Sequence, residues 1–197
     1  MAPIFYRCVM VYYRFIDDSS NKRQIQHNSG FILLKEGLLK EYGYNITESD
    51  IFTADKGKPY LRGRNDCFFS ISHCDGLCCC IITSCECGID CEKIRDYRPN
   101  VVRRIFTDSE QLWFGQLDPN DRNRFFFILW TLKESFGKFT GKGIADMKNV
   151  SFSIDNGVLK SDKSHLNFFV YEIDGYILST CVKKGQSPNC TFGKRIY

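Results

Sequence analysis

Two antiparallel hairpins, one in each half of this 197-residue chain, constrain its fold more than any other sequence feature. Residues 68–82 contain two β-rich runs joined by Asp75-Gly76. Residues 167–182 repeat this pattern around Asp174-Gly175, about 100 residues later. An Asp-Gly pair between two β-rich runs is a strong hairpin signal, because both residues tolerate the positive φ of a tight turn. We therefore predict antiparallel β structure in both halves of the chain.

Each of these hairpins is preceded by a segment with helical periodicity. The apolar residues from Phe31 to Tyr42 follow helical spacing, and Gly43 is a suitable C-terminal stop. The second helical pattern runs from about Asn120 to Phe139 and begins after Asp118-Pro119. A further hairpin is predicted around Asn156-Gly157.

This repeated order of elements predicts an α+β protein made of two similar halves, residues 1–95 and 96–197. Each half is expected to be a small, mostly antiparallel sheet packed with a long helix, and a pseudo-twofold axis relates the two. The first half opens with an alternating apolar segment, residues 4–15, that predicts a strand. Since a crevice between two packed halves is a natural ligand site, we expect the active site there.

Eleven cysteines raise the question of a disulfide framework, but their arrangement argues against one. The number is odd, and in the contiguous Cys78-Cys79-Cys80 the neighbouring thiols of a strand point to opposite faces. Free cysteine behaves as a small buried hydrophobe in a reducing compartment, which favours the cytoplasm. The spacing of Cys85, Cys87 and Cys91 keeps a structural zinc site as an alternative, although the sequence has no pair of C-x2-C knuckles.

The net charge of +4 and the pI near 8.4 are mildly basic and lack the dense basic stripe of a nucleic-acid-binding protein. They suit an acidic protein partner or a polyphosphate ligand. No apolar run approaches the roughly 18 residues of a membrane span, and the first residues do not follow a signal-peptide pattern. We therefore expect a soluble, non-secreted, cytoplasmic monomer that binds neither nucleic acid nor membrane.

Two acids stand two residues apart in the segment 87–92, which has a β-like pattern. Asp90 and Glu92 would project from one face of a strand, while Ile89 and Cys91 point into the core. Neighbouring carboxylates repel each other unless they share a proton or a cation, and magnesium prefers carboxylate and phosphate oxygens. A strand edge with two solvated acids is the alternative.

Three further groups of residues offer charge or phosphate contacts. Glu134 and Lys138 are i,i+4 neighbours on the predicted second helix, a spacing that a simple surface ion pair shares. Ser72 and His73 end a strand, where a hydroxyl and an imidazole can hold a phosphate; a turn histidine is the alternative. Pro59 keeps the backbone of Lys58 extended, and such a loop can present an ammonium group to a phosphate.

Taken in order, these segments resemble the 4'-phosphopantetheinyl transferase superfamily in its larger single-chain class, which is similar to two fused copies of a small trimeric type. The resemblance spans roughly residues 20–185. It rests on four motifs: Gly57-Lys58-Pro59, Phe69-x-x-Ser72-His73, Gly88-Ile89-Asp90-Cys91-Glu92 and Trp130-x-x-Lys133-Glu134-Ser135-x-x-Lys138. The chain departs from the family in having Ser70 for Asn, Cys74 for Ser and Cys91 for a branched aliphatic residue.

The resemblance implies transfer of the 4'-phosphopantetheine group of coenzyme A to a serine of an acyl or peptidyl carrier protein, with 3',5'-ADP as the leaving group. It further implies that Asp90, Glu92 and Glu134 hold a magnesium ion on the pyrophosphate. Lys133 and Lys138 occupy the two lysine positions of the family, and Lys138 is the better candidate for a pyrophosphate contact.

The same resemblance places Ser72 and His73 on the 3'-phosphate of coenzyme A, with Lys58 nearby. Glu110 matches a further acid near the metal. Where the family often has an arginine, this chain reads Gln26-His27-Asn28-Ser29-Gly30, and Lys22 or Arg23 is the candidate replacement.

The acceptor serine must lose a proton, and either Glu134 or a metal-bound water is the expected base. The carrier protein should be acidic around its serine, and it is expected to dock near Ile105-Phe106 and Leu112-Trp113-Phe114 unless these residues form core. Two alternatives remain: a homologue that binds coenzyme A or a carrier without turnover, and a cysteine-rich zinc-binding interaction module.

Overall fold

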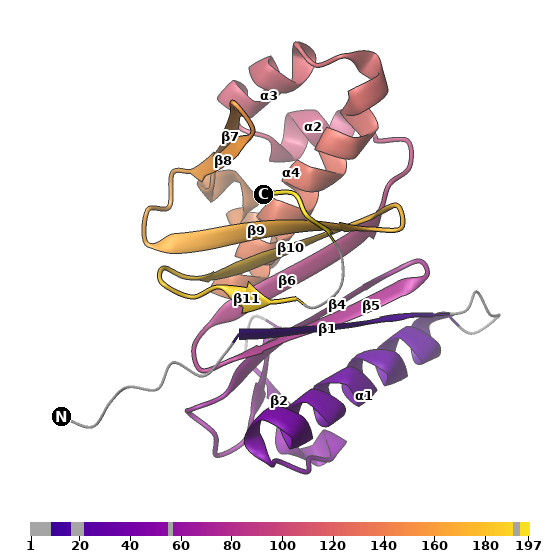
Figure 1. Cartoon of the computed structure of the whole chain (residues 1–197), viewed down its shortest axis with the longest axis vertical. Helices are drawn as coiled ribbons and strands as arrows, with labels where there is room; N and C mark the ends of the chain where they lie inside the picture. The colour runs from indigo at the N-terminus through magenta and orange to yellow at the C-terminus, as the bar shows by residue number, and fades with distance from the viewer. Residues whose placement is uncertain (1–8, 17–21, 55–56, 191–193) are drawn as a thin grey trace.

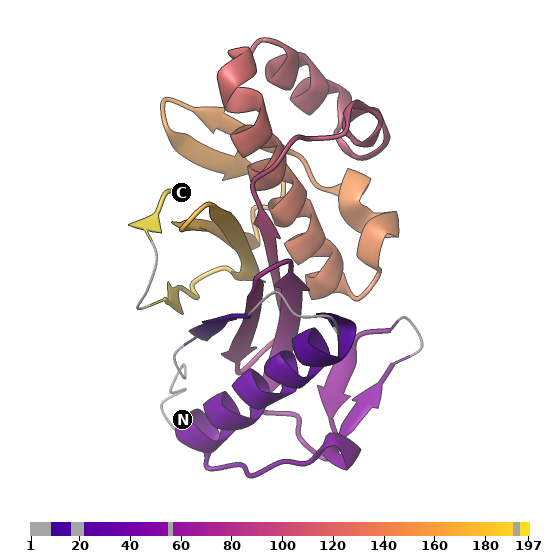
Figure 2. The same cartoon turned by 90° about the vertical axis from the view of Figure 1, so that its right-hand side faces the viewer.

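Two four-stranded sheets lie between two long helices (Figures 1 and 2). The computed structural model describes residues 9–16, 22–54, 57–190 and 194–197, and for residues 22 and 23 only the backbone. The structure is of the predicted α+β class.

The first sheet has the strand order β11-β1-β5-β4. Its strands are β1 (Val9–Phe15), β4 (Phe68–Cys74), β5 (Leu77–Thr83) and the short β11 (Pro188–Asn189). β4 and β5 form the hairpin predicted around Asp75-Gly76. The predicted strand at residues 4–15 is confirmed from Val9 onward, and residues 4–8 lie outside the described part of the chain.

Helix α1 (Lys22–Tyr42) covers the outer face of the first sheet (Figure 1). It ends at Gly43, whose φ of 70° confirms the predicted stop. The helix begins nine residues before the predicted Phe31, because its first turns carry mostly polar side chains and give no apolar periodicity. A tertiary contact holds these turns: Gln26 Nε2 donates a hydrogen bond to the carbonyl oxygen of Cys74 at 3.1 Å.

The second sheet has the strand order β12-β9-β10-β6 and is crossed by α4 (Pro119–Thr140) (Figure 2). Its strands are β6 (Cys87–Lys93), β9 (Leu166–Ile173), β10 (Tyr176–Lys183) and β12 (Lys194–Arg195). The hairpin at Asp174-Gly175 and the second long helix are confirmed. Asp118 caps α4 by accepting a hydrogen bond from the Asn120 backbone N–H at 2.8 Å.

Smaller elements surround the two sheets. In the first half they are η1 (Glu48–Asp50), β2 (Ile51–Thr53) and β3 (Pro59–Leu61). In the second half they are α2 (Pro99–Ile105), α3 (Asp108–Gly115), η2 (Gly143–Asn149), β7 (Phe152–Asp155) and β8 (Val158–Ser161). β7 and β8 form the hairpin predicted at Asn156-Gly157. The sequence analysis did not predict α2 and α3, which are only seven and eight residues long.

The two sheets contain the same local order of strands, β1-β5-β4 in one and β6-β10-β9 in the other. Both follow the chain order strand, long helix, hairpin, as the predicted duplication requires. Strand β6, which a boundary at residue 95 assigns to the first half, pairs with β10 in the second sheet. The pseudo-twofold axis itself remains a prediction.

Alternation along the strands divides the apolar side chains into three clusters. One cluster lies between α1 and the first sheet, one between the two sheets, and one under α4. Cys78 and Cys80 belong to the α1 cluster and Cys79 to the cluster between the sheets, as the alternation of a strand requires. No disulfide bond joins any two of the ten cysteines in the described part of the chain.

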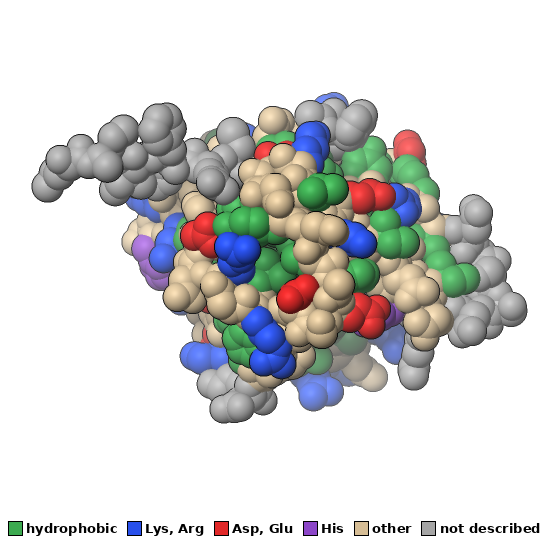
Figure 3. All heavy atoms as spheres, turned by 90° about the horizontal axis from the view of Figure 1, so that it is seen from below, with side chains coloured by type: hydrophobic (Ala, Val, Ile, Leu, Met, Phe, Trp, Pro, Cys, Tyr) green, Lys and Arg blue, Asp and Glu red, His purple; other side chains and the backbone are tan. Residues whose placement is uncertain are grey.

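The surface near α1 carries both signs of charge. Seen from this end of the molecule, basic and acidic side chains are interspersed with apolar ones (Figure 3). This mixture agrees with a net charge of only +4. Across the residues that the structure describes, the helices are too short or too polar to cross a membrane.

Candidate active site

The two sheets meet where their edge strands β4 and β6 lie side by side. Side chains of β4 make the connection. The Ile89 backbone N–H donates to Ser70 Oγ at 3.3 Å, and Ser72 Oγ donates to Asp90 Oδ1 at 2.7 Å. We call this contact between β4 and β6 the seam, and Asp90 lies on it.

Gly88 lets α4 pack directly on β6 next to Asp90. A Cβ atom at Gly88 would collide with the carbonyl oxygen of Ser135 and lie 2.6 Å from the backbone nitrogen of Phe139. The close approach brings one face of α4 over the seam, and this face carries Glu134 and Lys138.

Asp90 is buried, with 6% of its surface exposed, and its two oxygens have different surroundings. Oδ1 accepts hydrogen bonds from Ser72 and from Lys138 Nζ, the latter at 2.8 Å. Oδ2 is buried and receives no hydrogen bond from any described residue. Burial opposes the charge of Lys138, but the Asp90 carboxylate outweighs it and raises the pKa of Lys138.

Glu134 and Glu92 lie within the electrostatic field of Asp90. Burial, followed by the negative charge of Asp90, raises the pKa of Glu134 to about 7. Burial also raises the pKa of Glu92, against the opposing effect of Arg95, whose Nη1 lies 2.8 Å from Glu92 Oε2. Lys138 pairs with Asp90 and Arg95 with Glu92, and Glu134 adds a third carboxylate to this region. Within the described residues, no three acidic, histidine or cysteine side chains are arranged to hold a metal ion as they stand.

Two adjoining hollows open beside β4. The first, of about 360 Å³, is lined by Glu134, Lys138 and the Gly141–Ile144 loop. The second, of about 440 Å³, lies between α1, β4 and the β2 region and is lined by His73. Both hollows share the same three wall residues, Pro59, Phe69 and Ile71. These shared residues place the two hollows next to each other.

Ser72 and His73 do not act on the same side of β4. Ser72 is buried against Asp90, whereas the exposed side chain of His73 faces the second hollow. Desolvation, followed by the positive charges of Lys138 and His27, lowers the pKa of His73. The structure therefore brings His73 together with His27, which sequence reasoning did not single out.

Lys58 and Lys133 are buried, and their ammonium groups are used within the protein. Lys58 Nζ contacts the Glu86 carboxylate and donates to the carbonyl oxygens of Cys87 and Phe139 at 3.1 and 3.0 Å. It thereby ties the loop before β3 to the start of β6 and the end of α4.

Lys133 has no exposed surface and lies 2.8 Å from the carboxylate of Glu110. Its Nζ also donates to the carbonyl oxygens of Met147 and Val150. Glu110 in turn accepts hydrogen bonds from the backbone N–H groups of Thr107 and Phe152 at 2.7 and 2.9 Å. Glu110 thus forms a capping box with Thr107 at the start of α3, and its bond from Phe152 joins α3 to β7. These contacts occupy the carboxylate within the protein.

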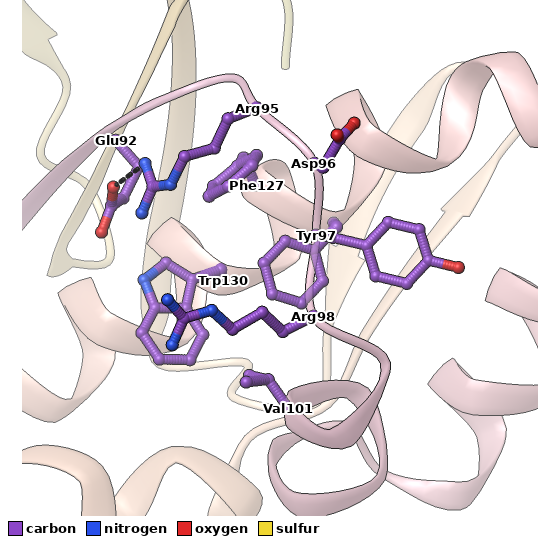
Figure 4. A pocket seen from close by; sticks show the side chains of 9 residues that line it. Glu92, Arg95, Asp96, Tyr97, Arg98, Val101, Phe127 and Trp130 are labelled. Atoms are coloured by element: carbon purple, nitrogen blue, oxygen red, sulfur yellow. Dashed lines mark hydrogen bonds and ion pairs between the residues drawn. The ribbon is translucent and has the colours of Figure 1, made fainter.

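A third hollow, of about 190 Å³, begins at Glu92 and extends along the β6–α2 connection (Figure 4). Arg95 and Arg98 line it together with ring faces of Tyr97, Phe127 and Trp130. No motif pointed to Arg95 or Arg98. Both arginines lie within six residues of Glu92 in the sequence. That spacing alone does not distinguish them from the arginines of an ordinary surface loop.

The segment expected to bind the carrier protein is mostly core. Ile105, Phe106 and Phe114 are at most 5% exposed and belong to the cluster under α4. Leu112 is the exception, with 69% of its surface exposed on α3. The side chains of Lys22 and Arg23 lie outside the described part of the structure.

Comparison with known proteins identifies similar sequences. A family model described as the 4'-phosphopantetheinyl transferase superfamily matches residues 86–181, which include β6, α4 and most of β10. The chain is 28% identical to the 4'-phosphopantetheinyl transferase Sfp of Bacillus subtilis over 166 residues, covering 81% of this chain and 74% of that protein. It is 32% identical to the 4'-phosphopantetheinyl transferase gsp of Aneurinibacillus migulanus over 162 residues, covering 76% of this chain and 67% of that protein.

Proposed function

Because the chain belongs to the 4'-phosphopantetheinyl transferase superfamily, we propose that it transfers the 4'-phosphopantetheine group of coenzyme A to a serine of a carrier protein. The acceptor would be an apo acyl or peptidyl carrier protein, as for a holo-[acyl-carrier-protein] synthase. The observation that carries this proposal is the concentration of three carboxylates and Lys138 at the seam, beside two adjacent hollows.

Two features of these carboxylates support the proposal of a magnesium ion. Asp90 Oδ2 is a buried oxygen that receives no hydrogen bond from the part of the chain that the structure describes, and the pKa of Glu134 is raised to about 7 by burial and neighbouring negative charge. A bound cation would contact the buried oxygen and offset the negative charge around Glu134. Carboxylate oxygens are also the ligands that magnesium prefers. We propose that Asp90, Glu92 and Glu134 hold it. When bound, it would supply positive charge to the pyrophosphate of coenzyme A.

The order of the hollows suggests how coenzyme A lies. We place the pyrophosphate in the first hollow, by Lys138 and Glu134, and the nucleotide end with its 3'-phosphate in the second, by His73. The pantetheine arm then leaves past Glu92 into the third hollow, over Trp130. Ser72 would act through its hydrogen bond to Asp90.

In the proposed reaction the carrier serine oxygen forms a bond to the β-phosphorus, and the bond from that phosphorus to the oxygen of 3',5'-ADP breaks. Asp90 and Glu92 are paired with Lys138 and Arg95, which leaves the Glu134 carboxylate as the proposed general base for the serine proton. Lys138 stabilises the charge that develops on the leaving phosphate. We propose that the buried Lys58 and Lys133 position the walls of this site.

The remaining features of the proposal concern the partner and the setting. The mild positive charge of the chain suits a carrier that is acidic around its serine. Among the described cysteines no disulfide bond joins one to another, which suits the proposed reducing cytoplasm. We propose that a monomer acts alone, with its active site between the two halves, residues 1–95 and 96–197.

The test is transfer from coenzyme A to a panel of purified apo carrier proteins with magnesium, read as the mass gain of the carrier. Asp90→Ala and Glu134→Ala should reduce kcat/KM by about a hundredfold or more, because they remove groups that act at the reacting phosphate. Glu36→Ala is the matched control. It removes an exposed acid of α1 that pairs with Arg14 of β1, and it should leave transfer unchanged.

Equal rates for the parent, Asp90→Ala and Glu134→Ala would refute the assigned site. Binding of coenzyme A without any transfer across the panel would favour a non-catalytic homologue. Stoichiometric zinc in the purified protein would instead support the cysteine-rich binding module.

A further inference from the structure

A fourth hollow, of about 350 Å³, lies between strand β8 of the β7–β8 hairpin and the first residues of β9 (Figure 1). None of the described residues that line it also lines the three hollows of the candidate active site. The charged side chains among these lining residues are all basic: Lys160, Lys163 and Arg195. An anionic segment in the hollow would therefore meet attractive charge on its walls.

Two acids stand next to this hollow without lining it. Asp155 lies 3.2 Å from Lys160, and Asp162 lies 2.9 Å from Lys163. Lys160 and Asp155 both keep more than half of their side-chain surface exposed. Because exposed ion pairs contribute little to stability, both lysines can turn to an acidic group that enters the hollow.

Strand β9 exposes part of its backbone edge to the hollow. The Val170 N–H donates to the carbonyl oxygen of Tyr197, and the Val170 carbonyl accepts from the Ile196 N–H, at 3.1 and 2.9 Å. These two groups therefore point away from β10. Phe168 stands two residues earlier, so its N–H and C=O point to the same side. The pairing of β12 stops before this point, and among the residues that the structure describes no strand lies beside Phe168 on this side.

The strand edge favours an extended peptide over a small anion. A free edge presents donors and acceptors in alternation, which another strand matches. A phosphate does not match them, because the carbonyl oxygens of the edge repel it. β8 belongs to a separate two-stranded sheet, so the hollow lies between two strands that do not pair with each other. The Arg195 guanidinium is held at this edge, 4.3 Å from the centroid of the Phe169 ring.

We propose that this hollow binds an extended acidic segment of a partner protein, which adds to β9 as a strand beside Phe168. The acidic side chains of that segment pair with Lys160, Lys163 and Arg195. The site goes beyond the proposed transfer reaction, because its residues take no part in that chemistry. It is measured without coenzyme A or a carrier protein.

The experiment is binding of a fluorescent peptide of alternating glutamate and valine to the full chain, measured by anisotropy. The double variant Lys160→Glu with Lys163→Glu should weaken binding about tenfold, because two attractive contacts become repulsive. Lys35→Glu with Lys40→Glu is the matched control. It reverses two exposed charges on α1 and should bind the peptide as the parent does.

A second peptide separates strand addition from simple attraction between charges. Methylation of its peptide nitrogens keeps the acidic side chains and removes the donors that pair with a strand edge. The methylated peptide should bind the parent about tenfold more weakly. The unmodified peptide should also slow hydrogen exchange at the Phe168 amide, measured by NMR.

Equal affinity for the two peptides would overturn strand addition and leave a general anion site. Unchanged affinity in the variant with Lys160→Glu and Lys163→Glu would place the peptide elsewhere and overturn the proposal as well. Thermal unfolding of both double variants checks that they fold as the parent does. Neither peptide result bears on phosphopantetheine transfer, so a failure of this site and a failure of the proposed function are distinguishable.

Discussion

At the residue scale, the lysines of the motifs divide by burial into two kinds. Lys138 keeps 28% of its side chain exposed beside Asp90, where a ligand can reach it. Lys133 has no exposed surface and pairs with Glu110, and Lys58 donates to three acceptors of the protein. A motif position therefore does not by itself identify a ligand contact, because a buried ammonium group with its acceptors filled stabilises the fold instead.

We expect Lys133→Met to lower the free energy of unfolding by about 3–5 kcal/mol, because it leaves the Glu110 carboxylate buried without its partner. Urea denaturation measures the change. The double variant Lys133→Met with Glu110→Gln should recover part of the loss, since no buried charge remains. Wild-type stability in Lys133→Met, together with weaker coenzyme A binding, would instead assign Lys133 a direct ligand contact.

The pKa of about 7 at Glu134 predicts that magnesium binding releases protons. A carboxylate must be deprotonated to hold a cation, and at pH 7 about half of the Glu134 side chains carry a proton. Magnesium affinity should therefore rise with pH through about pH 7 and level off above it. Calorimetry in two buffers with different ionisation enthalpies measures the protons released.

Glu134→Gln should abolish this proton release, because its amide does not titrate. The same release in the parent and in Glu134→Gln would place the titrating group elsewhere.

At the scale of elements, the contact between β6 and α4 builds the site. β6 contributes Asp90 and Glu92, and α4 contributes Glu134 and Lys138. The glycine at position 88 sets their separation, because any side chain there would meet the backbone of the helix. The sequence alone does not distinguish this glycine from any other strand residue, because its role depends on the helix that packs against it.

We expect Gly88→Ala to destabilise the protein and to reduce transfer, because the new methyl group forces α4 away from β6. The loss should be about 1–3 kcal/mol, the usual range for overpacking, measured by thermal or urea unfolding. Gly115→Ala at the end of α3 is the matched control, because a Cβ atom there meets no neighbour within 4 Å. Equal stability of the two variants would contradict the close packing of α4 on β6.

At the scale of the whole molecule, the two similar sheets do not make two equivalent sites. Asp90 pairs with Ser179, the fourth residue of β10, and Tyr12 pairs with Cys80, the fourth residue of β5. By this register, Tyr12 of the first sheet stands at the position that Asp90 has in the second sheet. Arg14 stands at the position of Glu92. The C-terminal strands β11 and β12 add to the edges at β1 and β9. The carboxylates are concentrated on one seam of the molecule.

A ligand in this seam should stabilise both halves together. We expect 3',5'-ADP to slow hydrogen exchange at the backbone amides of β4 and at those of the C-terminal half of α4, because the proposed site uses residues of both. Mass spectrometry of peptides from the two elements measures the effect, with α3 as an internal reference. Protection confined to one half would contradict a site between them.

The sequence by itself determined the hairpins, the long helices and the pairing of two acids on one strand face. Asp-Gly and Asn-Gly turns located the three hairpins, apolar periodicity located the two long helices, and the alternation of a strand put Asp90 and Glu92 on one face. These are local properties, readable from neighbours along the chain.

Burial and contact between distant segments were decided only by the tertiary structure. Packing turned Lys58, Lys133 and Glu110 into buried anchors, although their spacing matched ligand positions. It separated Ser72 from His73 by placing them on opposite faces of β4, and it brought His27 from a polar stretch of α1 to the same hollow as His73. The physical reason is that desolvation and pairing depend on which segments meet, a property of the folded chain that no single stretch of sequence contains.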